Sequence, residues 1–300
     1  MDRVSLVVGK DDAGRTVAAV LKERLLFSRS LLRLIKREGK ATLNGEPAWL
    51  VDRVGEGDVI EAGWGTACRS DIDPEEIPLD IIYEDESLLV VNKPPGMLVH
   101  PVRRERRGTL ANAVMGHWLK KGKQNPVFRP VYRIDRDTSG MVLVSADPVA
   151  HLSLAGQLRD KSLQRIYLAL AGGLFRFKEG IISQPIDRKP GSIIEREVSP
   201  LGRPALTHYR VIRRLTEINA TMLEVSLKTG RTHQIRVHFS HLGHPLLGDS
   251  LYGGDAALIG RQALHAYRIS FRHPTTGNYI VLKSDLPEDM KKLAPFFTGE

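Results

Sequence analysis

The stretch YRIDRDTSG, residues 132–140, holds two carboxylates between two arginines and ends in a turn. Asp137 opens the run Asp-Thr-Ser-Gly, in which a short polar side chain can bond its own backbone before a glycine, so we interpret Asp137 as a turn residue. Asp135 differs, because Arg133 and Arg136 flank it and a carboxylate beside guanidinium groups stays ionised. Such a carboxylate suits a nucleophile or a general base, and equally a structural ion pair.

Two further runs contain residue types that could contact an anionic ligand. KTGRTHQIRVHFSHLGHPLLGDSLYG, residues 228–253, gathers arginine and histidine at the start of a predicted helix. In it, Arg231 directly follows a Thr-Gly pair, and a helix start rich in arginine and backbone N–H groups suits anions. NKPPGMLVHP, residues 92–101, follows a predicted strand. Its prolines and glycine give it the rigid shape that a ligand-contacting loop requires.

The elements that must position these residues are mostly strands. From residue 81 onward the strand candidates are DIIYEDESLLVVNK, MVLVSAD, RIYLALAGG, ALTHYRVIRRL, TMLEVSLKTG, AYRISFRHP and NYIVLKSD. The helix candidates are GTLANAVMGHWLKK, PVAHLSLAGQLRD and THQIRVHFSHLG. Strands and helices do not alternate regularly. This order predicts an α+β domain with a mostly antiparallel mixed sheet rather than a doubly wound fold.

A smaller unit, residues 1–64, precedes this domain. It contains two predicted helices, GRTVAAVLKERL and SRSLLRLIKREG, and then the strand and Asn-Gly hairpin turn of ATLNG. A basic helix face followed by a hairpin can hold a phosphate backbone. The residues of this face expected to bind RNA are Arg29, Arg33, Lys36 and Arg37. We interpret residues 65–79, which are acidic and contain prolines, as a linker to a second domain at residues 80–300.

The composition favours a nucleic-acid partner. The formal net charge is +9 and the isoelectric point is about 9.7, and a basic chain of this size most often binds a polyanion. The single cysteine, Cys68, excludes an intramolecular disulfide and a cysteine-cluster zinc site, and fits a reducing cytosol. No apolar run approaches the roughly 20 residues that span a membrane, and no secretory apolar core opens the chain. We expect a monomeric cytoplasmic protein that binds RNA and no membrane.

Several runs in one order resemble the RluA-type pseudouridine synthases over about residues 80–285. They are NKPPGMLVHP, YRIDRDTSG, RIYLALAGG, GRPALTHY, GRTHQIRVHFSHLGHPLLGDSLYG and RQALHAYRISFRHP. The N-terminal unit is similar to the S4 RNA-binding domain. The resemblance implies an enzyme that isomerises uridine to pseudouridine in RNA without metal, ATP or redox cofactor. An S4-like unit favours large-subunit ribosomal RNA as the substrate. The alternatives are a tRNA-directed synthase and a non-enzymatic RNA-binding or ribosome-assembly protein.

The resemblance also assigns roles to single residues. Asp135 would be the catalytic aspartate, acting either as a base at C2′ or as a covalent nucleophile. Tyr167 would be the active-site tyrosine beneath the uracil, and Arg231 would pair with Asp135. Arg133 would enter the RNA as the target uridine flips out. Leu264 would be the apolar residue of the site.

Three positions depart from the family's pattern. Tyr132 stands where the family has histidine, Ile134 where it has leucine and Arg165 where it has lysine. The last two are conservative replacements. The first lies at a position that is not the family's catalyst, so it affects the expected RNA contacts more than the expected activity.

Two other interpretations begin from the same residues. Asp-Arg-Asp-Thr-Ser is close to the DxDx[TV] run of haloacid-dehalogenase-like phosphatases, but Arg133 interrupts the apolar strand which that fold requires, and no convincing acidic pair follows for magnesium. Zinc is the second alternative, since histidines cluster at His233, His238, His241 and His244. No cysteine lies near them, so we expect packed or RNA-facing histidines and no metal site.

Overall fold

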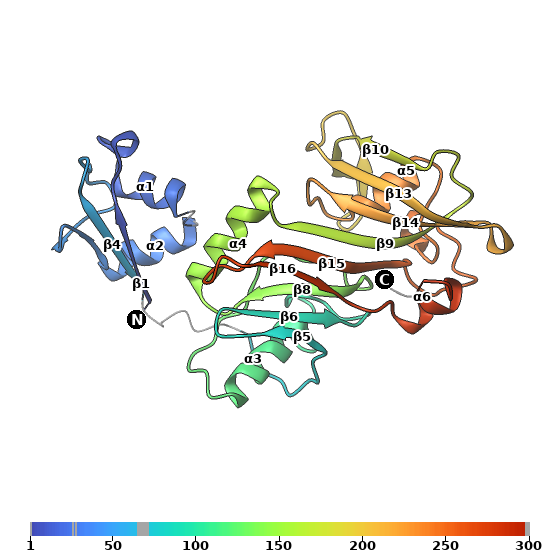
Figure 1. The fold of residues 1–300 in the computed structure, drawn as a ribbon, viewed down its shortest axis with the longest axis horizontal. Helices are drawn as coiled ribbons and strands as arrows, with labels where there is room; N and C mark the ends of the chain where they lie inside the picture. Colours follow the sequence, from blue (N-terminus) through green and yellow to red (C-terminus); the bar gives the residue numbers. More distant parts are fainter. Residues whose placement is uncertain (1, 26, 28, 65–71, 298–300) are drawn as a thin grey trace.

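A computed structural model describes residues 2–25, 27, 29–64 and 72–297 (Figure 1). Within this part of the chain the larger unit is built on a ten-stranded sheet with the order β10-β13-β14-β9-β15-β8-β6-β5, in which β16 pairs with β15 and β7 with β8. The strands are β5 (Ile81–Glu84), β6 (Leu88–Lys93), β7 (Arg129–Pro130), β8 (Ser139–Ser145), β9 (Gln164–Gly172), β10 (Glu179–Ser183), β13 (Leu206–Leu215), β14 (Ala220–Leu227), β15 (Leu264–Arg272) and β16 (Tyr279–Lys283).

The pairing pattern confirms the predicted α+β class and the mostly antiparallel mixed sheet. Among the described strands of this sheet, β8 and β15 form the one parallel pair, and the others pair antiparallel. Each of the strand-like runs forms a strand. At the parallel junction the backbones approach so closely that a Cβ atom on Gly140 would lie 2.4 Å from the carbonyl oxygen of Ala266. Gly140 also has a φ of 110°, so this junction requires glycine.

The three predicted helices form α3 (Leu110–Lys120), α4 (Pro148–Asp160) and α5 (Gln234–His241), and a short α6 (Glu288–Leu293) was not anticipated. Figure 1 shows α3 at the β5–β6 end of the sheet and α5 among β10, β13 and β14. Local chemistry explains the starts of the first two. Thr109 and Asn112 form a capping box at α3, and Asp147 caps α4 with a proline in its first turn. A small hairpin joins β11 (Ile186–Arg188) and β12 (Arg196–Val198), and three short 3₁₀ turns are η1 (Lys10–Asp12), η2 (Thr216–Ile218) and η3 (Ser250–Tyr252).

The core of this unit lies along its central strands. β8 is buried at every position, and β6 and β9 are buried over nearly their whole length. Strands covered on both faces read as continuous apolar runs rather than alternating ones, which is why LLVV and MVLV stand out in the sequence. The loop that contains Asp135 leads directly into β8, so this core fixes the position where the loop ends.

The N-terminal unit has its own core and sheet. Its helices are α1 (Val17–Arg24) and α2 (Arg29–Glu38), and its antiparallel sheet has the order β1-β4-β2-β3, with β1 (Asp2–Val7), β2 (Ala41–Leu43), β3 (Glu46–Pro47) and β4 (Val59–Trp64). The predicted hairpin turn is confirmed, since Asn44 and Gly45 have φ values of 53° and 86°. Gly39, at a φ of 62°, follows the end of α2. The strand β1 was not anticipated, because the apolar but exposed Val7 hides the alternation in which Val4 and Leu6 face the core.

The second half of the expected linker, residues 72–79, lies against α3. The Glu75 amide donates to the carbonyl of Asn112 at 3.0 Å, and the Asn112 side chain donates to the carbonyl of Asp73 at 2.7 Å. A Cβ on Gly116 would lie 2.2 Å from the Glu75 carbonyl oxygen, so glycine lets the segment approach the helix. The first half, residues 65–71, lies outside the described residues. None of the described helices is long and apolar enough to cross a membrane.

Beside the parallel junction, a buried histidine predicts a pH-dependent stability. His265 is fully buried between the hydroxyls of Ser139 and Ser284, each 2.9 Å from a ring nitrogen, and burial lowers its pKa to about 4. In the unfolded chain the His265 ring binds a proton near pH 6.5. Between about pH 6.5 and pH 4 the unfolded state therefore carries more protons than the folded state. The free energy of unfolding is therefore expected to fall by about 3 kcal/mol as the pH falls through this window.

Urea unfolding at pH 7 and pH 4.5 measures this loss, and His265→Gln is the control. The variant lacks the titrating ring, so its loss over the same interval is expected to be smaller by about 2 kcal/mol or more. Equal losses in the two proteins would show that His265 does not carry the effect.

Candidate active site

A cavity of about 590 Å³ opens in the larger unit where the loop before β8, strand β9 and the segment before α5 meet. Its volume lies within the usual range of small-ligand sites. All five residues that the sequence assigned to the site of this unit line it: Arg133, Asp135, Tyr167, Arg231 and Leu264. Segments more than 120 residues apart in the chain are therefore brought to one cavity.

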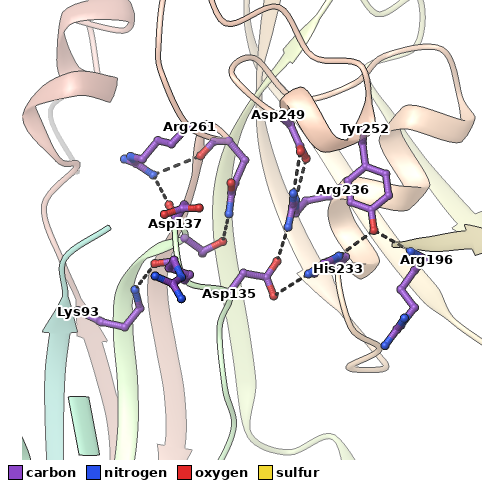
Figure 2. Close-up of polar contacts among 12 residues, drawn as sticks. Lys93, Asp135, Asp137, Arg196, His233, Arg236, Asp249, Tyr252 and Arg261 are labelled. Carbon is purple, nitrogen blue, oxygen red and sulfur yellow. Dashed lines mark hydrogen bonds and ion pairs between the residues drawn. The ribbon is translucent and has the colours of Figure 1, made fainter. Parts of the chain in front are cut away.

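Asp135 is held by an arginine from α5 (Figure 2). Its Oδ2 accepts a hydrogen bond from Arg236 Nη1 at 3.2 Å, and its side chain remains 25% exposed. The Nε and Nη2 of Arg236 donate to the two oxygens of Asp249 at 2.7 and 2.8 Å, and the Asp249 side chain is only 1% exposed. A bidentate pair of this kind fixes the plane of the guanidinium group. Arg236 therefore presents its remaining donor to Asp135 in one orientation.

The predicted pairing of Arg231 with Asp135 is wrong. The Nε of Arg231 donates to the carbonyl of Pro204 at 3.0 Å, and its backbone N–H donates to the side chain of Gln234 at 3.0 Å. Helix α5 begins only at Gln234, so Arg231 lies in the irregular segment before it. Arg236, within the helix, is the arginine that reaches the carboxylate.

His233 also faces Asp135. It caps α5 in the left-handed conformation, at φ 56°, and its Nε2 lies 3.9 Å from Asp135 Oδ1. Its Nδ1 lies 2.7 Å from the Tyr252 hydroxyl, which accepts from the Arg196 N–H at 2.9 Å. Because the Tyr252 oxygen accepts from Arg196, we infer that the Tyr252 hydroxyl donates its hydrogen to His233 Nδ1. The imidazole hydrogen is then on Nε2, which faces Asp135. Burial lowers the pKa of His233, so the ring is neutral near pH 7.

Residues 133–138, the Asp135 loop, are held by the buried Lys93 and the partly buried Arg261 (Figure 2). The fully buried Lys93 Nζ donates to the carbonyls of Pro94 and Arg136 at 2.7 and 2.8 Å. Burial lowers the pKa of Lys93 to about 7. Arg261 donates to the carbonyl of Asp137 at 2.9 Å. These bonds use the backbone of the loop and leave the Asp135 carboxylate to Arg236.

Asp137 lies in a turn, which confirms its interpretation from the sequence. The Thr138 N–H donates to the carbonyl of Asp135 at 3.2 Å and closes this turn. The Gln262 side chain donates to the Thr138 hydroxyl at 3.3 Å. The turn thus projects Asp135 toward the cavity while its neighbours are bonded to the core.

Tyr167 lies in β9, is buried, and forms part of the cavity wall. Burial raises the pKa of its hydroxyl, so the side chain is a neutral phenol near pH 7. Two of the family departures lie beside it and touch each other, since the Arg165 guanidinium stacks 5.0 Å from the centre of the Tyr132 ring. The Tyr132 hydroxyl donates to the carbonyl of Met141 at 3.1 Å and is buried. Tyr132 therefore contributes packing to the wall.

The remaining expected RNA contacts differ in their surroundings. Arg133 is exposed at the cavity, and Leu264 is buried in its wall at the start of β15. On α2 the three described members of the basic face, Arg33, Lys36 and Arg37, are exposed. The side chain of Arg29 lies outside the described residues.

Three of the four clustered histidines, His233, His238 and His244, have separate protein partners. His238 contacts the Thr207 hydroxyl at 2.8 Å and the Gln184 carbonyl at 3.0 Å, and His244 contacts the Gly172 carbonyl at 2.7 Å. Across residues 2–25, 27, 29–64 and 72–297, no three His, Cys, Asp or Glu side chains are grouped as metal ligands.

The residues that hold Asp135 and its loop in place were not identified from the sequence. Lys93 lies in NKPPG, which was interpreted only as a rigid loop, and Arg236 and His233 follow Arg231 in the GRTHQIR run. Asp249 and Tyr252 lie in GDSLYG at the end of the same run. Only Lys93 carried a signal in the sequence, because it ends the apolar run LLVVNK, and a lysine buried together with such a strand needs a partner.

Comparison with known proteins places these residues in a family. The family model for RNA pseudouridylate synthase matches residues 87–241. An uncharacterized RNA pseudouridine synthase of Bacillus subtilis, YhcT, is 38% identical over 290 residues, which cover 97% of this chain and 96% of that protein. Ribosomal large subunit pseudouridine synthase D of Neisseria meningitidis is 38% identical over 310 residues, covering 97% of this chain and 81% of that protein.

The fold agrees with these sequence matches. The human RNA pseudouridylate synthase domain containing 1 superposes with a TM-score of 0.60 at 24% identity, covering 73% of this chain and 89% of that one. This likeness supports the fold, while the family match and the relatives carry the activity. The chain belongs to the RNA pseudouridylate synthase family and is an RNA pseudouridine synthase.

Proposed function

We propose that this enzyme isomerises uridines of large-subunit ribosomal RNA, as a monomer in the cytoplasm. The observation that carries the catalytic part is Asp135, a carboxylate that faces a 590 Å³ cavity and is oriented by Arg236 at 3.2 Å. The ribosomal substrate is supported by a relative over 97% of the chain that is named for the large subunit. A net charge of +9 suits a large folded RNA.

The reaction assigns a different task to each cavity residue. The N1–C1′ bond of the uridine must break and the freed uracil must rejoin the sugar through C5, so a carboxylate is needed beside the sugar. Asp135 supplies it, either as a base at C2′ or as a nucleophile, and both routes need the carboxylate in the position in which Arg236 holds it. Tyr167 supports the uracil ring from the wall, as a neutral phenol that can hydrogen-bond the rotating base. Leu264 supplies an apolar contact.

The target uridine must leave its stack before it can enter the cavity. Arg133 is exposed at the entrance, and its planar guanidinium can stack in the vacated space and bond the stranded partner base. Arg231 also lines the cavity, and we assign it to RNA binding instead of to Asp135. Unstacking costs a few kcal/mol, which phosphate contacts on a basic surface can offset.

We further propose that residues 1–64 form an S4-like RNA-binding domain, joined by the linker 65–79 to the catalytic domain 80–300. The separate core, the basic face of α2 and the following β2–β3 hairpin support this division. Such a unit would give the enzyme a second contact with a large RNA, apart from the uridine in the cavity.

The basic face of α2 is expected to contribute to affinity and not to chemistry. Replacing Arg33, Lys36 and Arg37 with alanine should weaken RNA binding and lower the slope of log affinity against log salt by about 2, because each lost phosphate contact lowers it by about 0.7 to 0.9. Binding of ribosomal RNA measured across a salt series checks this. An unchanged affinity and slope would exclude the α2 face from the RNA interface.

The substrate assignment is tested by tritium release. Large-subunit ribosomal RNA and bulk tRNA, each labelled with tritium at uracil C5 and taken from cells lacking the enzyme, are incubated separately with the protein in EDTA. We expect stoichiometric release from the ribosomal RNA and none from the tRNA. Release from tRNA alone would establish the tRNA-directed alternative. Release from neither would contradict the proposed substrate.

A further inference from the structure

A carboxylate of the C-terminal helix α6 holds the arginine that lies against the Asp135 loop. The Nε and Nη2 of Arg261 donate to the two oxygens of Asp289 at 2.6 and 2.9 Å, and the Arg261 side chain is only 9% exposed. Partial burial alone would raise the pKa of Asp289, but the hydrogen bonds from Arg261 outweigh this effect and lower it. Asp289 is therefore ionised near pH 7, and the bidentate pair fixes the plane of the guanidinium group.

The remaining nitrogen of Arg261, Nη1, faces the Asp135 loop. It donates to the carbonyl of Asp137 at 2.9 Å, and lies 3.2 and 3.4 Å from the carbonyl oxygens of Gln262 and Leu264 (Figure 2). Asp137 belongs to the turn that presents Asp135, and Leu264 lies in the cavity wall. Arg261 thus joins the Asp135 loop to the start of β15.

Helix α6 is fixed to the sheet by its apolar side. Met290 is fully buried and Leu286 and Ala294 are nearly so, and all three belong to one cluster with Leu168 of β9. Strand β9 also contributes to the cavity wall, so α6 and the cavity share one rigid support. Asp289, in the first turn of α6, therefore has a fixed position relative to the cavity.

The same arrangement of groups occurs twice around Asp135. Asp249 fixes Arg236, whose remaining donor reaches the Asp135 carboxylate. Asp289 fixes Arg261, whose remaining donor reaches the backbone of the same loop. The first pair orients the reacting group, and the second holds the chain that carries it. Both matter for the rate, because a misplacement of about 1 Å can lower it by about 10²-fold.

We propose that Asp289 is a positioning residue for pseudouridine formation, which acts through Arg261 and the Asp137 carbonyl to hold Asp135 in its place. Neither Asp289 nor Arg261 is among the residues that line the cavity. The C-terminal helix thereby contributes to the chemical step without contacting the reacting atoms. The inference rests on Asp135 as the catalyst of the proposed function.

The first test compares turnover with RNA affinity. Asp289→Asn keeps the shape of the side chain and removes its charge. It is expected to lower kcat by about tenfold, because the loop is held less firmly, and to leave KM for RNA within about threefold. Arg261→Lys keeps the charge but not the planar fork, so we expect a similar loss of kcat. An unchanged kcat in either variant, or a loss confined to KM, would overturn the proposal.

A double variant determines whether Asp289 acts through Arg261. In an Arg261→Met background the pair no longer exists, so adding Asp289→Asn should lower kcat by less than about twofold further. Losses that multiply would show that Asp289 acts by another route, and would overturn the proposal.

Hydrogen exchange reports on the loop independently of activity and needs only the wild type and Asp289→Asn. The Thr138 N–H closes the turn by donating to the Asp135 carbonyl at 3.2 Å. In Asp289→Asn, a peptide that contains residues 133–138 should exchange about tenfold faster than in the wild type, because the loop opens more often. Unchanged exchange in this peptide would contradict the proposed role even if kcat falls.

Glu224→Gln is the matched control for both measurements. It breaks an ion pair with Arg210, 3.2 Å long, between two residues that do not line the cavity. We expect kcat and the exchange of residues 133–138 to stay within about twofold of the wild type. Equal changes in Glu224→Gln and Asp289→Asn would overturn the inference. In that event, tritium release that Asp135→Asn abolishes would leave the proposed function intact, whereas release that survives Asp135→Asn would refute the proposed function itself.

Discussion

Replacing Asp135 with asparagine is expected to lower pseudouridine formation by at least about 10³-fold, while the protein still folds and binds RNA. Asparagine has the shape of aspartate, but it cannot accept a proton at neutral pH or attack as a carboxylate. Asp135 is the carboxylate that faces the cavity and lies 3.2 Å from Arg236. Tritium release from C5-labelled RNA under single-turnover conditions measures the chemical step directly.

Asp137→Asn is the matched control for this experiment. It changes the second carboxylate of the same run, but the loop is held at this residue through the Asp137 carbonyl, to which Arg261 donates. We expect it to keep turnover within about tenfold of the wild type. Substantial activity in Asp135→Asn, or an equal loss in both variants, would show that the catalyst lies elsewhere.

The second large effect is expected at Arg236. Arg236→Ala should lower turnover at saturating RNA by about 10²-fold, because a hydrogen bond to a charged group contributes about 1.5–3 kcal/mol and Asp135 loses its orienting partner. In contrast, Arg231→Ala should keep turnover within about fivefold and change mainly KM, since its guanidinium contacts the Pro204 carbonyl. Single-turnover rates and KM for both variants measure the difference. A larger loss of turnover in Arg231→Ala would contradict the assignment.

Stability must be separated from catalysis in this comparison. Arg236→Ala leaves the buried Asp249 without its bidentate partner, and breaking a buried pair costs about 3–5 kcal/mol. The double variant Arg236→Met/Asp249→Asn removes that uncompensated charge, so its free energy of unfolding should recover in part. We expect its turnover to stay low, because Asp135 still lacks a donor. Recovery of activity together with stability would show that Arg236 acts only on the fold.

Residues with strong local patterns were predictable. The apolar runs of β6 and β8 indicated buried strands, because a strand that is covered on both faces is apolar at nearly every position. The Asn44-Gly45 pair indicated a hairpin, because few other residues adopt the backbone conformation of such a turn. Strand β1 and helix α6 carried no such pattern. They depend on pairing and packing with distant parts of the chain, and a local window does not contain that information.

The partners of the Asp135 carboxylate were not predictable in the same way. Arg231 and Arg236 occur in one run five residues apart, and both are arginines near a helix start. Which of them reaches Asp135 depends on where α5 begins and on how Asp249 holds the guanidinium. These are properties of the assembled site, so residue type and spacing alone favoured the wrong arginine.

The sequence by itself determined the α+β class, the RNA pseudouridine synthase activity and five of the residues that line the cavity, because element periodicity and several motifs in one order are local properties of the chain. The tertiary structure decided the pairing of Asp135 with Arg236, the placement of His233 against Asp135, and the burial of Lys93 against the Asp135 loop. Each of these depends on distances between segments far apart in the chain, which exist only after the sheet has formed.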